Sequence, residues 1–333
     1  MNTKLHIPQE NVFANSPSGD QGNIVVAMDI GGTKIKLGLV SGDKILCASS
    51  IDAESSNGLL NKLPVIESVV DDMMRQQSIS KSNIAGVGIS MPGIVDSKQK
   101  KVLSIDNKFN DVVNLDINKW VADTWQTKLE IENDARCALI GEWQYGKGKG
   151  YNNVVLMTIG TGVGSSAVNE GNILRGKHFQ AGCLGGHFTI NLRGRKCNCG
   201  NIGCVETEAS TWNIENIAKH HSLYKSSVLS GENRIDFESI FRYANEEDAL
   251  AKELRNICVN VWSAAAVNLI HAYDPEVLVM GGGVMKSADF IIPYVQQQTN
   301  AHAWTPWGNV KIEAAENINE AALLGAAWLV YNN

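Results

Sequence analysis

Residues 23–40 read NIVVAMDIGGTKIKLGLV, which is an apolar run, a glycine turn and an alternating segment in direct succession. The apolar run predicts a buried strand, and the period-two alternation at 34–39 predicts a second strand. Gly31 and Gly32 between them let backbone N–H groups approach a phosphate closely, and Asp29 beside the turn can hold magnesium through water. On this local pattern alone, a plain hairpin with an exposed Asp29 is an equally good interpretation.

A second stretch repeats this order. Residues 154–168 read VVLMTIGTGVGSSAV, an apolar strand entering a turn rich in glycine and threonine. The likeness predicts two related halves, each offering one phosphate loop. The spacing is not that of a dinucleotide fingerprint, because Ser165 replaces the third glycine and a strand is expected to follow. No G-x-x-x-x-G-K-[ST] motif occurs, which excludes a P-loop nucleotide site at motif level.

Further elements follow from apolar periodicity. We expect strands at 84–89, 129–131 and 277–280, and helices at 59–77, 117–125, 135–145, 207–220, 248–273 and 319–331. Asp134 falls at a strand-to-helix junction, where its carboxylate would either face the space beyond the sheet or cap the helix. The triple glycine 281–283 would suit the close approach of a flat ligand such as adenosine, or simply a tight turn.

Residues 187–206 read HFTINLRGRKCNCGNIGCVE and carry a metal-type pattern, H-x9-C-x-C-x4-C. His187, Cys197, Cys199 and Cys204 together offer one imidazole and three thiolates, the donor set of a structural zinc with no open coordination position. Glycines in the loop permit the tight folding that would bring the four side chains together. The alternative is a set of ordinary buried thiols or a disulfide.

Composition limits the class of protein. The 333 residues are 44% hydrophobic and 19% charged, which is typical of a soluble globular protein of about two domains. A net charge of −6 argues against a nucleic-acid partner. Residues 1–22 are polar and lack a signal-peptide core, and the apolar run at 321–331 is too short to cross a membrane. A cytoplasmic location is therefore expected, with 1–22 as a flexible extension.

Taken together, three glycine-rich strand ends and one strand-end carboxylate indicate an ATP-dependent phosphotransferase. Phosphoryl transfer requires cradled phosphates, magnesium and a positioned acceptor, and little covalent chemistry from the protein. A carboxylate next to the acceptor hydroxyl can take its proton, an effect of about 10²–10⁴-fold. Asp134 is the candidate for that general base.

Several motifs, in this order, resemble the ROK family of sugar kinases over residues 23–331. They are DIGGTK (29–34), GISMPG (88–93), END (132–134), GTGVG (160–164), the cysteine cluster and DPEVLVMGGG (274–283). The resemblance implies a ribonuclease-H-like, actin/hexokinase-type fold of two α/β domains around a cleft. The small domain would comprise 23–133 plus the C-terminal helix 319–333. The large domain would comprise 134–318 and include the zinc loop 187–206.

The resemblance also implies roles for individual residues. Asp134 would act as base toward the sugar 6-hydroxyl. Sugar contacts would come from Asn107, Asn133, Asp134, His187 and Glu206. Contacts to ATP and magnesium would come from Asp29, Gly31, Gly32, Thr33, Lys34, Thr161, Gly162 and Gly282. His187 would place one ring nitrogen on zinc and the other toward sugar, so that the metal fixes its tautomer. A homodimer or homotetramer is expected.

One departure from the family pattern bears on the substrate. The family places E-x-G-H before its zinc histidine, whereas Leu184 occupies the Glu position here. A leucine cannot accept a hydrogen bond from an anomeric hydroxyl, at a cost of about 1–3 kcal/mol. We expect a sugar substituted near that position, such as a β-glucoside, unless a local realignment supplies another carboxylate. Alternative functions are a sugar-responsive transcription regulator of the same family and a non-catalytic sugar-binding protein. The regulator is disfavoured because 1–22 is too short for a DNA-binding module.

Overall fold

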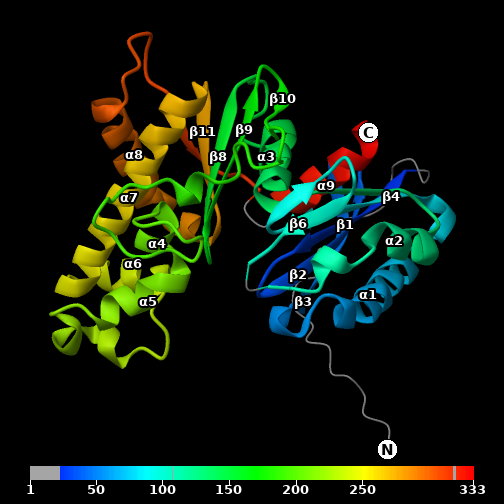
Figure 1. Cartoon of the computed structure of the whole chain (residues 1–333), viewed down its shortest axis with the longest axis horizontal. Helices are drawn as coiled ribbons and strands as arrows, with labels where there is room; N and C mark the ends of the chain where they lie inside the picture. Colours follow the sequence, from blue (N-terminus) through cyan, green and yellow to red (C-terminus); the bar gives the residue numbers. More distant parts are fainter. Residues whose placement is uncertain (1–22, 107, 318–319) are drawn as a thin grey trace, which may run out of the picture. The chain divides into compact units, whose positions relative to one another are not determined.

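The chain is described by a computed structural model over residues 23–106, 108–317 and 320–333. It divides into two compact α/β units, drawn in Figure 1. Unit 1 ends its first segment at Asp134 and takes up the chain again at Ala326–Asn333. Unit 2 comprises Ala135–Gly325. Each unit is built on its own five-stranded sheet.

The sheet of unit 1 has the strand order β3-β2-β1-β4-β7. β1 (Ile24–Ile30) pairs antiparallel with β2 (Lys34–Ser41), which pairs antiparallel with β3 (Lys44–Asp52). On its other side β1 is parallel to β4 (Ile84–Met91), and β4 is parallel to β7 (Leu129–Asn133). The hairpin expected at 24–39 is therefore confirmed, with its glycine turn between β1 and β2.

The sheet of unit 2 follows the same plan, with the order β10-β9-β8-β11-β12. β8 (Val154–Ile159) forms an antiparallel hairpin with β9 (Val163–Asn169), which β10 (Asn172–Ile173) extends. β11 (Val277–Gly281) is parallel to both β8 and β12 (Lys311–Ala314). Strand for strand, the two sheets have one topology, which confirms the two related halves expected from the sequence.

Helices cover both faces of the sheet in unit 1. α1 (Leu63–Gln76) and α2 (Ile117–Trp125) contribute to one apolar core with β1, β2 and β4. The part of α9 (Ala321–Asn332) that belongs to unit 1 packs on the face of β4 that carries Gly88. A Cβ on Gly88 would lie 2.2 Å from the Ala326 carbonyl oxygen, so only glycine allows this approach. A short hairpin joins β5 (Ile94–Asp96) and β6 (Lys101–Ser104).

Unit 2 is mainly helical outside its sheet. Its helices are α3 (Asp134–Tyr145, whose first residue is assigned to unit 1), α4 (Val205–Glu208), α5 (Thr211–Lys219), α6 (Phe237–Asn245), α7 (Ala249–Tyr273) and α8 (Ala288–His302). The long α7 starts at its N-cap Asp248 and supplies much of the core, including the fully buried Trp262. The sequence analysis did not identify α6, α8, β3, β5, β6, β10 or β12.

Two predicted helices differ from the structure. The helix expected at 59–77 begins at Leu63, after two 3₁₀ turns, because Pro64 favours the first turn of a helix. The helix expected at 207–220 is split into α4 and α5 at Ala209 and Ser210. There the Ala209 carbonyl accepts a bond from Trp262 Nε1 (2.9 Å), and the backbone of Ser210 is extended. Tertiary contacts thus override a continuous helical pattern.

Across the described ranges, every helix is too short or too polar to span a lipid bilayer. α7 has 25 residues but carries charged side chains in its first turns, among them Lys252, Glu253 and Arg255.

Candidate active site

The first glycine turn joins β1 to β2 and has backbone donors that are unpaired within the described residues. The Gly31 N–H is used inside the turn, where it donates to the carbonyls of Asp29 (3.1 Å) and Lys34 (3.0 Å). The N–H groups of Gly32 and Thr33 have no acceptor among the described residues. Backbone donors left unpaired in a turn form a concave site for an anion. The predicted phosphate loop therefore has the donors that a phosphate requires.

Asp29 lies at the end of β1, beside this turn. Its Oδ1 accepts a hydrogen bond from Ser90 Oγ (2.8 Å), which lies opposite it on β4, and Lys36 faces it across β2. Desolvation by the surrounding protein raises the pKa of Asp29, while the Ser90 hydrogen bond and the Lys36 charge lower it. The net shift is upward. An ionised Asp29 therefore costs stability until a cation approaches it.

Lys34 is the lysine of the DIGGTK motif. Its Nζ forms an ion pair with Asp52 Oδ1 on β3 at 2.7 Å, and both side chains are largely exposed. This ion pair lowers the pKa of Asp52. The expected role of Lys34 next to ATP remains a prediction, and binding nucleotide through its ammonium would compete with this pair.

The second glycine turn joins β8 to β9 in unit 2. Gly160 N–H donates to the Gly162 carbonyl (2.9 Å), and the N–H groups of Thr161 and Gly162 have no acceptor within the described chain. The carbonyls of Gly160 and Thr161 accept bonds from the first two N–H groups of α5, both at 3.1 Å. The break between α4 and α5 thus fixes the turn in position.

Glu206, expected at the sugar, lies against this second turn. Its Oε2 accepts a hydrogen bond from Val163 N–H (2.9 Å), and a Cβ on Gly162 would lie 2.4 Å from the same oxygen. A carboxylate at this position accepts bonds from hydroxyl groups and repels a phosphate. The arrangement therefore favours a hydroxylated ligand near Glu206.

Gly282 follows β11 and is restricted in two ways. Its φ is +91°, and a Cβ would lie 2.2 Å from the Ile159 carbonyl oxygen at the end of β8. Only glycine suits both the backbone conformation and the contact. This close approach brings the chain after β11 against the β8 end of the second turn, where the sequence analysis expected the adenosine.

Asn133 and Asp134 stand where β7 ends and α3 begins, as predicted. Asn133 Nδ2 donates to the Gly93 carbonyl (3.0 Å) and to Asp134 Oδ1 (2.8 Å). Glu132 Oε1 accepts from the Asn133 N–H (2.9 Å), and both of these side chains are buried. Asp134 itself is exposed. Its carboxylate is thus oriented by a buried amide at a helix N-terminus, where negative charge is favoured. Asn107, the remaining predicted sugar contact, lies outside the described residues.

His187, Cys197, Cys199 and Cys204 converge as predicted. Their ligand atoms all lie within 4.8 Å of one another, with the Cys199 and Cys204 sulfurs 3.8 Å apart and Cys197 Sγ 3.7 Å from His187 Nδ1. Sulfur atoms around a tetrahedral zinc with bonds of about 2.3 Å lie about 3.8 Å apart, and a sulfur and a nitrogen about 3.6 Å apart. A disulfide requires about 2.05 Å, so the Cys199–Cys204 pair is not one. The cluster is compatible with a structural zinc ion.

Close backbone contacts bring the histidine into this cluster. A Cβ on Gly186 would lie 1.8 Å from the Val163 carbonyl oxygen, and Gly185 N–H donates to Ser165 Oγ (2.8 Å). His187 is therefore held next to the start of β9. Without metal, burial and the neighbouring thiols raise the pKa of Cys204 to about 12. A bound cation would reverse this, because metal ligation deprotonates thiols.

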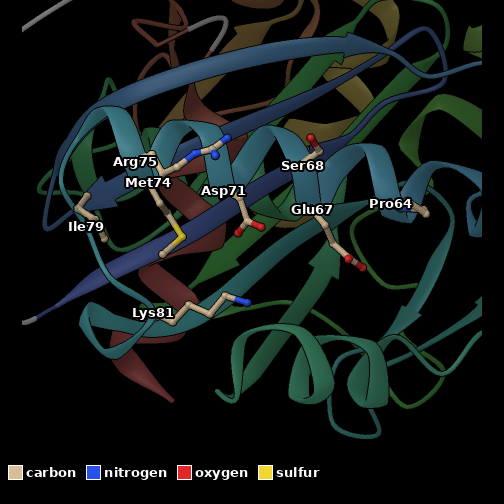
Figure 2. Close-up of a pocket in the computed structure, with 8 residues that line it drawn as sticks. All are labelled: Pro64, Glu67, Ser68, Asp71, Met74, Arg75, Ile79 and Lys81. Carbon is tan, nitrogen blue, oxygen red and sulfur yellow. The ribbon is translucent and has the colours of Figure 1, made fainter. Parts of the chain in front are cut away.

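The described surface also has an open groove of about 540 Å³ along α1, shown in Figure 2. Two of its charged groups have structural partners: Glu67 accepts a hydrogen bond from Trp120 Nε1 (2.6 Å), and Lys81 Nζ donates to the Thr124 carbonyl (2.8 Å). None of the predicted site residues lines this groove. We assign it no role in the site.

Fold and site together define a duplicated α/β protein with two anion-type glycine turns and a Cys₃His cluster. The chain matches the ROK family over residues 25–333 and belongs to that family. It is 30% identical to a glucokinase of Halalkalibacterium halodurans over 321 residues, which is 92% of this chain and 94% of the relative. It is 26% identical to a beta-glucoside kinase of Listeria monocytogenes over 315 residues, covering 91% of this chain and 96% of the relative.

Solved structures agree on the fold. The ROK hexokinase from Thermus thermophilus superposes with a TM-score of 0.74 at 25% identity, covering 93% of this chain and 98% of that one. A ROK family transcriptional regulator superposes with a TM-score of 0.78 at 23% identity, covering 93% of this chain and 78% of that one. The expected actin/hexokinase-type fold and the family resemblance are therefore confirmed.

Sequence reasoning missed three residues next to the first turn. Ser90 lies in the quoted GISMPG motif and Lys36 alternates with Lys34 on β2, so the pairing of both with Asp29 follows once the strand order is known. Lys108 also contacts this turn, and no local pattern pointed to it.

We expect the purified protein to contain about one equivalent of zinc, measured by mass spectrometry. Cys204→Ser should lose the metal and lower the melting temperature, because metal affinity contributes to folding of the loop. Cys183→Ser is the matched control, since Cys183 lies outside the cluster and should keep the zinc. A metal-free wild-type protein whose stability is unaffected by Cys204→Ser would contradict this expectation.

Asp29→Asn should stabilise the nucleotide-free protein at neutral pH. The folded-state pKa of Asp29 is raised, so its stabilising contribution is present below the unfolded value (about 3.9) and is lost as pH rises through the folded value. In urea unfolding, the variant should therefore have a higher free energy of unfolding than wild type at pH 8, and nearly the same value near pH 4. Asp52→Asn should not raise the free energy of unfolding at pH 8, because the pKa of Asp52 is lowered. A gain for Asp29→Asn that does not depend on pH would contradict the assignment.

Proposed function

We propose that this protein is an ATP-dependent sugar kinase that transfers the γ-phosphoryl group to the 6-hydroxyl of a hexose or hexose derivative. The observation that carries the proposal is the pair of glycine turns at equivalent places in two sheets. Each turn leaves two backbone N–H groups without an acceptor in the described chain. The names of the glucokinase and beta-glucoside kinase relatives support the same chemistry.

On the nucleotide side, the proposal assigns the phosphates to the turns and the adenosine to Gly282. In the first turn the donors are the N–H groups of Gly32 and Thr33, with Gly31 shaping the turn, and in the second they are those of Thr161 and Gly162. Magnesium, when bound with ATP, neutralises charge on the transferring phosphoryl group. Asp29 is the residue that would hold that ion through water. Burial raises the pKa of its carboxyl group, and a bound cation would favour the ionised form.

On the sugar side, Asp134 acts as the general base. Its carboxylate takes the proton of the 6-hydroxyl while the sugar oxygen bonds to the γ-phosphorus and the bond from that phosphorus to the ADP oxygen breaks. Asn133 supports this role, because its amide binds Asp134 Oδ1 and so orients the carboxylate. The exposure of Asp134 agrees with a group that must reach a substrate.

His187 and Glu206 contribute the remaining sugar contacts in this proposal, with Asn107 expected to assist. The Nδ1 atom of His187 faces the thiols, so a metal bound there leaves Nε2 as the nitrogen available to a sugar hydroxyl. The cluster then fixes the tautomer and the ring orientation. Zinc in this role is structural and takes no part in the transfer.

Leu184 bears on which sugar is the substrate. It is 36% exposed and stands three residues before His187, where the family pattern has a glutamate. An apolar side chain at that point suits a substituted anomeric position, as in a β-glucoside, better than a free hydroxyl. The beta-glucoside kinase among the relatives supports this choice.

Asp134→Asn should lower kcat by about 10²–10⁴-fold and leave sugar binding intact, because it removes the base and keeps the shape of the side chain. ADP release with a panel of hexoses, N-acylhexosamines and β-glucosides measures turnover, and calorimetry measures binding. Asp43→Asn, at an exposed turn, is the control and should leave turnover and sugar binding unchanged. Near-normal turnover by Asp134→Asn would remove the assignment. Specific operator binding together with absent turnover would favour the regulator alternative.

Cellobiose or methyl β-glucoside should have a higher kcat/KM than free glucose. Leu184→Glu should lower the ratio of kcat/KM for the glucoside to kcat/KM for glucose by about tenfold, since the new carboxylate can accept a hydrogen bond from the anomeric hydroxyl. Leu192→Glu is the matched control, because Leu192 is 90% exposed and lies eight residues further along the chain, outside the E-x-G-H position of the family pattern. Equal kcat/KM values for glucose and the glucosides would contradict the substrate assignment.

A further inference from the structure

We propose that Lys108 is a phosphate-binding residue, and that its ammonium group completes the anion site of the first glycine turn. The inference rests on the proposed function in one respect, since it takes the anion to be the phosphate chain of a nucleotide. Neither the motifs of the sequence nor the family resemblance identified this residue.

The contact between Lys108 and the turn is direct. A Cβ built on Gly32 would lie 2.7 Å from Lys108 Cε, 2.8 Å from Cδ and 3.3 Å from Nζ. The end of the lysine side chain therefore lies over the α-carbon of Gly32. Both residues belong to unit 1 and are partly buried. The absence of a side chain at Gly32 is what makes room for the lysine.

The charge of Lys108 is available for a ligand. Within the described ranges its ammonium has no ion pair and no hydrogen bond. Lys34, the lysine of the turn itself, is instead paired with Asp52 at 2.7 Å. Of these two lysines, Lys108 is the one that can neutralise an anion without first breaking an ion pair.

The residues that follow Lys108 are firmly held. Phe109 is fully buried in the core of unit 1 with φ +42°, and its N–H donates to the Ser55 carbonyl (2.8 Å). The Asp111 carboxylate accepts from the N–H groups of Leu59 and Leu60, both at 2.8 Å. Because the residues that follow it are anchored in this way, Lys108 loses less conformational entropy on binding than a lysine on a free loop.

The resulting donor set suits a phosphate. The Gly32 and Thr33 N–H groups and the Lys108 ammonium are three donors at one turn, and one of them carries a full charge. Charge-assisted hydrogen bonds to phosphate are about twice as strong as neutral ones. A lysine near a glycine turn also offsets the repulsion between the phosphate and the Asp29 carboxylate at the end of β1.

The test compares Lys108→Met and Lys108→Arg with wild type, and uses Lys101→Met as a control at an exposed lysine on β6. Calorimetry with magnesium ADP and with tripolyphosphate measures the anion site, and steady-state kinetics give KM for ATP and for the sugar. Lys108→Met should lower the affinity for both anions by about 10–100-fold and raise KM for ATP, while the affinity for sugar stays unchanged. Lys108→Arg should recover most of the loss, and Lys101→Met should behave as wild type.

The outcomes separate this inference from the proposed function. If the wild type shows no sugar kinase activity and yet binds tripolyphosphate in a Lys108-dependent manner, the kinase proposal fails and the assignment of Lys108 stands. If the wild type phosphorylates sugars and Lys108→Met retains its affinity for ADP and its KM for ATP, the assignment of Lys108 fails. It also fails if the wild type binds neither anion. Far-UV circular dichroism of each variant confirms that it is folded.

Discussion

Two backbone N–H groups at the end of a sheet, with no acceptor in the described part of the chain, are the constraint on which the rest of this structure depends. An unpaired backbone donor is unfavourable unless water or a ligand satisfies it. In each unit the turn of the central hairpin has such a pair, judged on the described residues, at Gly32 and Thr33 and again at Thr161 and Gly162. The surrounding strands and helices hold these turns in a shape that an anion can occupy.

Duplication of the sheet has not produced two equivalent sites. The first turn is approached by the ammonium group of Lys108, and the second by the carboxylate of Glu206. Both side chains occupy the space that a glycine leaves open, and they carry opposite charges. The Lys108 ammonium adds a charged donor for a phosphate at the first turn. At the second turn a phosphate has the Thr161 and Gly162 N–H groups alone, and the Glu206 carboxylate is a better partner for hydroxyl groups. The two turns share one backbone arrangement, and they differ in the charged side chain that a distant segment places beside each of them.

The sequence predicted what local pattern determines and missed what distant segments supply. The hairpins, the strand end at Asn133 and the convergence of the Cys₃His cluster follow from periodicity, glycine placement and ligand spacing. Lys108 could not be found in this way, because its contact with Gly32 joins residues 76 positions apart through a loop with no pattern of its own. The split between α4 and α5 was missed for the same reason, since it depends on Trp262 and on the carbonyls of the second turn.

The Cys₃His loop shows why a metal would be useful in a segment that does no chemistry. Its regular structure between His187 and Cys204 is limited to two isolated bridges, Thr189 with Cys204 and Lys196 with Ile202. Leu192 is 90% exposed and Ile202 49% exposed, while Phe188 and Ile190 are partly buried against the core of unit 2. Apolar burial therefore stabilises only the first part of the loop. Yet this loop positions His187 and leads directly into Glu206, both of which the proposed chemistry requires. Four ligands on one ion would cross-link the loop where apolar contacts are few, and would tie the side chains proposed to bind sugar to the start of β9.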